Sequence, residues 1–315
     1  MTASNAEPTS ASTGSGRALA AAVACYFSWG LIPILFQYVG RLGVGPWEIL
    51  AHRILWSAPT AAVLVLLGRL GGDVRTVLGR PRTLAWLALS ATAIAVNWIV
   101  FIWAVNSQRV LEASLGYYIL PLLNMAAGAL LFGERIDRVG RIAIGLAVAG
   151  VALQTLALGH LPLISLALAI SFGAYGIIRK RVEAEAQTGF LFESAFLLLP
   201  SAAFAAWTGL HGHSRFGHDL PLSAWLIACG PLTTIPLLWF AWAARRLPLS
   251  AMGFLQFISP TLTFGLGVFE GEPLSPVRGA SFVLIWAGVA AFAYGAWRRT
   301  RSAFAAVATV EAAAE

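Results

Sequence analysis

Ten uninterrupted apolar runs, each about twenty residues long, limit most strongly what this chain can fold into. They lie at 18–39, 48–68, 84–105, 112–132, 138–158, 161–179, 187–209, 222–243, 249–269 and 277–297. An α-helix rises about 1.5 Å per residue, so each run can cross the roughly 30 Å hydrocarbon core of a bilayer. Barrel strands instead alternate in polarity over about ten residues, which these runs do not do. The sequence therefore predicts an all-α integral membrane protein with ten transmembrane helices.

Composition supports a lipid environment. Hydrophobic residues make up 58% of the chain and charged residues 11%, with a mean hydropathy of +0.77. Soluble domains carry about 25% charged residues, so this chain could not cover a surface that faces water. The lipid bilayer is the expected surroundings of the runs. Residues 1–17 have no basic residue before Arg17 and are expected to be a disordered tail rather than a signal peptide, and 298–315 to be a loose C-terminal tail.

Basic residues indicate the orientation. If the ten helices alternate in direction, 16 of the 21 Lys and Arg residues fall on the side that holds both termini. Cytoplasmic loops are rich in Lys and Arg, so both termini are predicted to be cytoplasmic in a multi-pass protein of the cytoplasmic (inner or plasma) membrane. These loops also account for the net charge of +7. Because no basic and aromatic cluster lies outside the runs, we expect no nucleic-acid partner.

The two halves of the chain resemble each other in order. The segment "FIWAV" at 101–105 matches "FAWAA" at 240–244, and the same offset relates Pro121 to Pro260. "YFSWGLI" at 26–32 matches "FGAYGII" at 172–178. Each half holds five runs, an odd number, so the second half would enter the membrane from the opposite side. The sequence thus predicts two inverted five-helix repeats, 18–158 and 161–297, an arrangement common in secondary transporters.

Several motifs carry a family resemblance. The segments "EILAHRILWS", "NWIVFIWAV", "LEASLGYYILPLLN", "FGERI", "RRLPLSAMGFLQFISPTL" and "GEPLSP" resemble those of RarD-type permeases, in the EamA-like branch of the drug/metabolite transporter superfamily. The resemblance covers roughly residues 18–297. It implies a ten-helix, two-repeat fold in the cytoplasmic membrane and a permease activity that is often labelled chloramphenicol-related. The superfamily leans towards export.

Three ionisable residues stand at the start of the second run. Glu48, His52 and Arg53 lie within the first turns of that run, on its predicted outer side. A charge inside a membrane is costly and is a functional hypothesis by default. We expect Arg53 and His52 to form the cationic part of a solute cavity. His52 could also couple a proton, since His titrates near neutral pH. The alternative is that Arg53 only reaches the lipid headgroups, with Glu48 paired to it or to His52.

Glu193 is the repeat equivalent of His52, at an offset of 141 residues. In an inverted repeat it would lie in the inner half of the membrane. No Lys or Arg accompanies it on its own helix, so it is predicted to be an unpaired carboxylate that could carry a proton. The competing interpretation is a structural hydrogen bond to a neighbouring helix.

Other polar and aromatic residues at depth are predicted to complete the binding site for a small-molecule solute. They are Trp29, Asn97, Trp98, Tyr117, Tyr118, Tyr175 and Gln256. Aromatic rings suit a planar or amphipathic solute, and Arg53 suits an anionic group on it. The cavity is expected between the first four helices of each repeat. The fifth helices, 138–158 and 277–297, would lie at the periphery, where they could form a homodimer contact.

These observations favour a secondary permease that moves a small metabolite or drug-like solute by alternating access, in the export direction. No nucleotide-binding or catalytic motif is present, and the His-rich segment 211–219 is interpreted as a solvated loop. We therefore expect no enzyme activity, no cofactor and no metal. One alternative is a non-transporting sensor or assembly factor on the same fold. Another is an intramembrane enzyme, which would require Glu48, His52 and Glu112 to converge.

Overall fold

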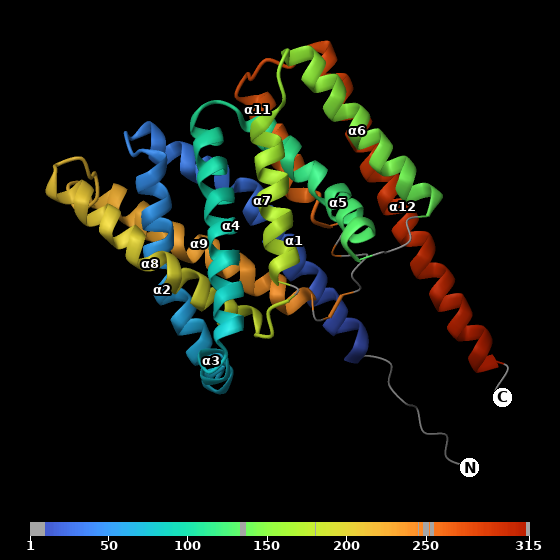
Figure 1. Cartoon of the computed structure of the whole chain (residues 1–315), viewed down its shortest axis with the longest axis horizontal. Helices are drawn as coiled ribbons and strands as arrows, with labels where there is room; N and C mark the ends of the chain where they lie inside the picture. The colour runs from blue at the N-terminus through green and yellow to red at the C-terminus, as the bar shows by residue number, and fades with distance from the viewer. Residues whose placement is uncertain are drawn as a thin grey trace.

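The computed structural model describes residues 10–132, 137–179, 181–244, 246–247, 252 and 255–312, and within them the regular elements are all α-helices. This described part of the chain forms eleven helices, whose arrangement Figure 1 shows. They are α1 (Ser10–Arg41), α2 (Pro46–Leu67), α3 (Gly71–Leu78), α4 (Pro81–Asn106), α5 (Val110–Phe132), α6 (Arg138–Leu158), α7 (Leu163–Arg179), α8 (Ala186–Leu210), α9 (Leu220–Ala244), α11 (Ile258–Phe269) and α12 (Pro276–Ala312). Apart from α3, the helices follow the predicted apolar runs in order.

Most of these helices can cross a bilayer. By length and composition, seven helices within the described residues are long and apolar enough to do so. Three more apolar segments are shorter: Val110–Leu123, Leu163–Arg179 and Ile258–Phe269. Large apolar side chains are also exposed on the outside of the bundle, as with Leu199 at 77% and Leu210 at 86%. Lipid tails are the surroundings in which such exposure is stable, so the chain is a multi-pass membrane protein.

The structure differs from the sequence prediction at four places. Helix α1 begins at Ser10, within the expected disordered tail, and α12 continues to Ala312, through the expected loose tail. That C-terminal stretch is rich in Ala and free of Gly and Pro, which favours helix. Helix α11 begins at Ile258, and 248–251, near the predicted start of that run, lie outside the described residues. Helix α3 was not predicted because "GGDVRTVL" is short and polar.

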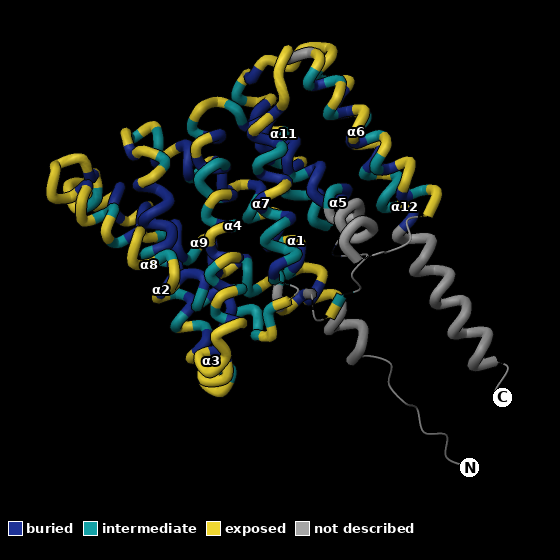
Figure 2. The backbone as a smooth tube through the Cα atoms, in the orientation of Figure 1, coloured by how far each residue is buried: buried dark blue, intermediate teal, exposed yellow. Residues whose placement is uncertain are grey.

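Eight helices pack around the centre of the molecule. Helix α2 packs against α8 and α9, α1 against α9 and α11, α4 against α7 and α8, and α5 against α7 and α11. Helices α6 and α12 pair with each other at one side of the bundle (Figure 1). Figure 2 shows buried residues concentrated on the inward faces of the central helices, with exposed stretches along α6 and α8. The peripheral position predicted for the fifth helix of each half is therefore the observed one.

Polar contacts join neighbouring segments at both ends of the bundle. At the end that carries α3, called the α3 side, Arg80 pairs with Glu183 at 2.6 Å. At the opposite end, called the far side, Glu270 accepts hydrogen bonds from Gln37 at 2.7 Å and Arg41 at 3.1 Å. Also on the far side, Glu272 accepts from the first backbone N–H groups of α5, which partly offsets the rise in its pKa that burial causes.

Candidate solute-binding cavity

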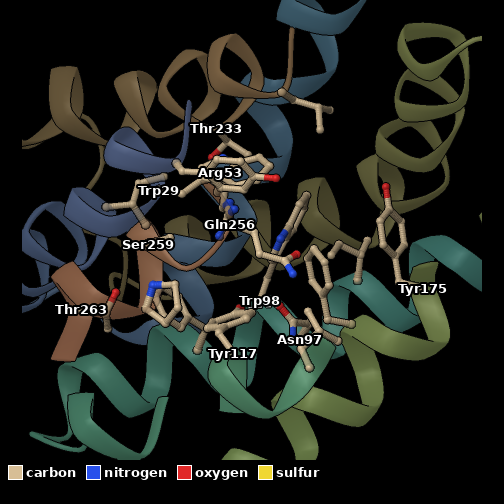
Figure 3. Close-up of a pocket in the computed structure, with 18 of the residues that line it drawn as sticks. Trp29, Arg53, Asn97, Trp98, Tyr117, Tyr175, Thr233, Gln256, Ser259 and Thr263 are labelled. Atoms are coloured by element: carbon tan, nitrogen blue, oxygen red, sulfur yellow. Dashed lines mark hydrogen bonds between the residues drawn. The ribbon is translucent and has the colours of Figure 1, made fainter. Parts of the chain in front are cut away.

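A cavity of about 170 Å³ lies among the eight central helices. Its volume would hold on the order of ten water molecules. Side chains from α1, α2, α4, α5, α7, α8, α9 and α11 line it, together with Gln256 just before α11, whereas α6 and α12 contribute none. This is the position predicted for a solute cavity from the sequence. Figure 3 shows the labelled side chains gathered around it.

The structure brings seven of the predicted site residues to this cavity. They are Trp29, Arg53, Asn97, Trp98, Tyr117, Tyr175 and Gln256. Helical periodicity explains the grouping on α4, where residues 94, 97, 98 and 101 all line the cavity and so share one face. Their position fits solute contact, which remains a prediction.

Arg53 is the cavity's charged residue. Only 6% of its surface is exposed, and no described carboxylate lies within ion-pair distance of it. Its guanidinium carbon lies 4.1 Å from the ring centroid of Trp98 and 5.3 Å from that of Phe36. Its Nε atom is buried without a hydrogen-bond partner among the described residues. Aromatic faces attract a cation but do not replace an anionic partner.

Asn97 has its hydrogen-bonding capacity committed to protein groups. Its amide nitrogen donates to the Leu168 carbonyl at 3.0 Å and to the Ser171 hydroxyl at 3.1 Å. Its amide oxygen accepts from the Tyr117 hydroxyl at 2.9 Å. Asn97 therefore joins α4, α5 and α7 and fixes Tyr117 against the cavity, rather than presenting a free amide to a solute.

Substitution of Asn97 tests that interpretation. We expect Asn97→Ala to lower the free energy of unfolding by about 2 kcal/mol, because it leaves buried partners on two helices unpaired. Tyr117→Phe removes only one of these hydrogen bonds and should cost about 1 kcal/mol. Thermal unfolding of the two purified variants measures the difference. Equal stability of Asn97→Ala and the wild type would contradict the assigned structural role.

Glu193 lies at the centre of a buried group, which we call the Glu193 cluster: Ser90, Tyr175, Arg179 and Glu193. The carboxylate accepts hydrogen bonds from the Ser90 hydroxyl and, at 3.3 Å, from the Tyr175 hydroxyl. Arg179 Nη1 lies 3.6 Å from it. The prediction of an unpaired carboxylate is therefore wrong, because the last residue of α7 supplies a cation that the sequence of α8 alone could not reveal.

A glycine makes room for that cation. A Cβ atom on Gly189, one turn before Glu193 on α8, would lie 1.9 Å from Arg179 Nη1. The guanidinium thus occupies the space next to the glycine backbone. The cluster also adjoins the cavity, since the Tyr175 ring lines it and so does Ile94, one turn from Ser90 on α4. A change at Tyr175 can therefore reach the buried ion pair directly.

His52 and Glu48 lie away from the cavity wall. The His52 ring stacks on Phe216 with centroids 4.5 Å apart, and both its nitrogens are buried without a hydrogen-bond partner in the described chain. The sequence suggested a pair of Glu48 with Arg53 or His52, and the structure does not show that pair. Glu48 instead accepts hydrogen bonds from the Ser214 hydroxyl at 2.8 Å and the Arg215 backbone N–H at 2.9 Å. The α8–α9 loop comes close enough to provide these partners, which helix periodicity could not predict.

Tyr118 faces a different part of the protein from Tyr117. Its hydroxyl lies 2.7 Å from that of Thr261, and its ring packs against Phe257 and Trp286. Adjacent residues on a helix point about 100° apart, and here Tyr117 lines the cavity whereas Tyr118 turns towards Thr261 and Trp286. Glu112 is likewise occupied elsewhere, in an ion pair with Arg109 at 2.9 Å.

Sequence reasoning missed several lining residues. Among them are Tyr26, Phe172, Phe190, Thr233, Ser259 and Thr263. A helical-spacing signal could have found two of these, because residues 256, 259, 260 and 263 follow one face from the predicted Gln256. No local signal pointed to Arg179 or Ser90, whose importance comes from their contact with another helix.

Comparison with known proteins places the chain that forms this cavity in a transporter family. Residues 16–156 match the model of the EamA-like transporter family. The chain is 42% identical to "Protein RarD" of Escherichia coli K12 over 86% of this chain and 92% of that protein. The chain belongs to the RarD group of the EamA-like transporter family. Another relative is an "Uncharacterized transporter" of Vibrio cholerae, 40% identical over 86% of this chain and 90% of that protein.

Two further comparisons extend this RarD-type assignment. A "Chloramphenicol-sensitive protein RarD" of Pseudomonas aeruginosa is 31% identical over 77% of this chain and 82% of its own length. A protein solved by crystallography has a TM-score of 0.56 and 18% identity, and the match covers 87% of this chain and 96% of the other. At that identity the likeness concerns the fold alone. The RarD-type fold observed here thus has an experimental counterpart.

Proposed function

We propose that this RarD-type protein is a secondary permease that moves a small metabolite or drug-like solute by alternating access, in the export direction. The observation that carries the proposal is the cavity of aromatic and polar side chains at the centre of a multi-pass member of a transporter family. A transporter family and a solute-sized internal cavity together favour a carrier over an enzyme. We place the protein in the cytoplasmic membrane with both termini in the cytoplasm, on the charge distribution of its loops.

The helix contacts support a ten-helix fold with two inverted repeats, 18–158 and 161–297. In this proposal α1, α2, α4, α5 and α6 correspond to α7, α8, α9, α11 and α12. Exchanging the repeats turns the α2–α9 contact into α8–α4, α1–α9 into α7–α4, and α1–α11 into α7–α5, and all of these contacts are present. The α2–α8, α5–α11 and α6–α12 contacts map onto themselves. A pseudo-two-fold axis relates repeats in many secondary transporters, with the binding site at the interface of the repeats.

We assign solute contact to the predicted residues that line the cavity other than Asn97, which is bound to protein groups. Arg53 is the charged contact, and Trp29, Trp98 and Tyr117 are aromatic walls. Tyr118 and His52 are not part of this proposed wall, because both pack against other protein groups. Glu193 is the proposed proton-coupling residue, since its cluster touches the cavity through Tyr175. His52 stays a second candidate for coupling on the far side, because its ring nitrogens are unpaired.

Two groups of contacts, one towards each end of the bundle, support an alternating-access cycle. Contacts of Glu270 join α1 to the end of α11 on the far side, and the Glu193 cluster joins α4, α7 and α8 towards the α3 side. In the proposed cycle, one of these groups of contacts opens while the other stays closed. The fifth helices α6 and α12 stay outside this rearrangement, where they could support a homodimer.

The test is a comparison of whole cells that overproduce the wild-type protein, Arg53→Ala or Arg75→Ala at equal abundance in the membrane. Untargeted mass spectrometry measures metabolite pools in the cells and in the medium. We expect a solute to accumulate in the medium with the wild type and with Arg75→Ala, whose residue is exposed on α3, but not with Arg53→Ala. Identical pools in all three strains, in several media, would contradict the carrier and favour a sensor or assembly factor.

A further inference from the structure

Arg53 is a buried cation, and the carboxylates on its own helix α2 and on the adjoining α8 are bound to other groups. Glu48 lies five residues before Arg53 on α2, and Glu193 lies on α8, which packs against α2. Glu48 is held by Ser214 and Arg215, and Glu193 by Ser90, Tyr175 and Arg179. Burying a charge without a partner costs several kcal/mol, so a protein keeps such a group mainly where a ligand completes it.

Aromatic rings hold the guanidinium in a fixed place. Trp98 on α4 and Phe36 on α1 both lie within cation–π distance of it, and Trp98 and Arg53 both line the cavity. An arginine fixed by ring faces keeps its N–H edge available and loses little side-chain entropy when it binds. Figure 3 shows Arg53, Trp98 and Gln256 among the side chains that surround the cavity.

The wall formed by α11 is polar but uncharged. Gln256, Ser259 and Thr263 line it, and none of the three makes a side-chain hydrogen bond to another described residue. Other surfaces of the cavity are aromatic, from Trp29, Trp98 and Tyr117. The cavity thus offers one positive charge, flat aromatic surfaces and neutral hydrogen-bonding groups.

We propose, on the basis of the permease function above, that the cavity selects small aromatic monoanions, with Arg53 as the anchor of their carboxylate group. One guanidinium can neutralise one carboxylate through two parallel hydrogen bonds. The described wall has no second cation, so it could not neutralise a dianion. A cationic solute would face Arg53 with like charge and no carboxylate of the cavity wall to bind. A neutral solute would leave the buried guanidinium uncompensated.

The test measures binding to the purified full-length protein in lipid nanodiscs by isothermal titration calorimetry. Four probes of similar size separate the contribution of the negative charge from that of the aromatic ring. They are phenylacetate, its amide phenylacetamide, the non-aromatic acid cyclohexylacetate and the cation phenethylamine. We expect phenylacetate to bind at least roughly tenfold more tightly than phenylacetamide and phenethylamine, as one charge-assisted contact predicts. It should also bind more tightly than cyclohexylacetate, which has the carboxylate but no aromatic ring to stack on the walls. Partition of the probes into lipid is removed by subtracting the signal of empty nanodiscs.

Two variants locate the interaction. We expect Arg53→Gln to weaken phenylacetate at least roughly tenfold and to leave phenylacetamide unchanged, whereas Arg53→Lys keeps part of the preference for the acid. Circular dichroism and elution as a single species identify the variants that remain folded. The proposal is overturned if phenylacetamide or phenethylamine binds as well as phenylacetate, if none of the probes binds at millimolar concentration, or if Arg53→Gln binds the acid as the wild type does.

The whole-cell comparison separates this proposal from the permease function on which it rests. Export of a neutral or cationic solute would overturn the anion selectivity and leave the permease intact. Absence of any exported solute, together with Arg53-dependent binding of phenylacetate, would support an anion-binding site and contradict transport.

Discussion

Replacement of Glu193 by Gln is expected to abolish proton-driven transport and to leave solute exchange across the membrane intact. The amide can keep hydrogen bonds to Ser90 and Tyr175, but it neither carries the charge that pairs with Arg179 nor binds and releases a proton. Because the amide cannot bind and release a proton, net uphill transport should fall to the background, and the loss of one partner of a buried pair should lower the free energy of unfolding by about 3 kcal/mol.

The measurement uses protein reconstituted in vesicles, with the solute found in the whole-cell comparison and an imposed pH gradient. Uphill transport reports coupling, and counterflow of labelled solute at equal pH reports exchange. Glu183→Gln is the matched control, since Glu183 is an exposed carboxylate that also pairs with an arginine, Arg80. That variant should transport as the wild type does.

A double variant distinguishes a proton carrier from a structural ion pair. Glu193→Gln with Arg179→Gln removes both charges of this pair, so neither one is left buried without its partner. If the pair only supports the fold, the double variant should recover the transport that Glu193→Gln loses. If Glu193 carries the proton, the double variant stays uncoupled, and unimpaired uphill transport by Glu193→Gln alone would contradict the assignment.

The sequence could predict the helices and most of the cavity wall because both depend on periodicity. Apolar runs gave the helices, and the polar residues that interrupt one helical face, such as Asn97 and Gln256, belong to the wall. Periodicity is a property of one helix, so it could not predict which residues meet across helices. Arg179 shows the limit, because its place beside Glu193 depends on the absence of a side chain at Gly189.

The two repeats also differ where the chemistry would be carried out. Glu193 and His52 occupy equivalent positions in the sequence, but Glu193 has a cation and two hydroxyl donors, whereas His52 has a phenylalanine ring. Arg53, next to His52, supplies the charge of the cavity instead. In the proposed carrier, the two halves would thus contribute a cation and a carboxylate at different places, an arrangement that suits the coupling of anion transport to protons.

The contact between α2 and α9 leads to the second large effect, on stability. A Cβ atom on Gly230 would lie 2.3 Å from the backbone carbon of Trp56, a distance that no rotamer change can relieve. We expect Gly230→Ala to destabilise the fold by about 1–3 kcal/mol through overpacking, although Ala is the better helix former. Gly145→Ala is the matched control, because Gly145 is exposed on α6 with open space around it, and it should be neutral or stabilising by roughly 0.5 kcal/mol.

Gly230→Ala should also alter the cavity, because Gly230 lies where α2 and α9, which both contribute to the cavity wall, contact each other. Trp56 lies one turn after Arg53 on α2, and Thr233, which lines the cavity, lies one turn after Gly230 on α9. Forcing α2 and α9 apart would therefore move Arg53 away from Trp98. Thermal unfolding in detergent measures the stability of both glycine variants, and calorimetry with phenylacetate measures the site. Equal stability and equal affinity for Gly230→Ala and Gly145→Ala would contradict the close packing on which the position of Arg53 depends.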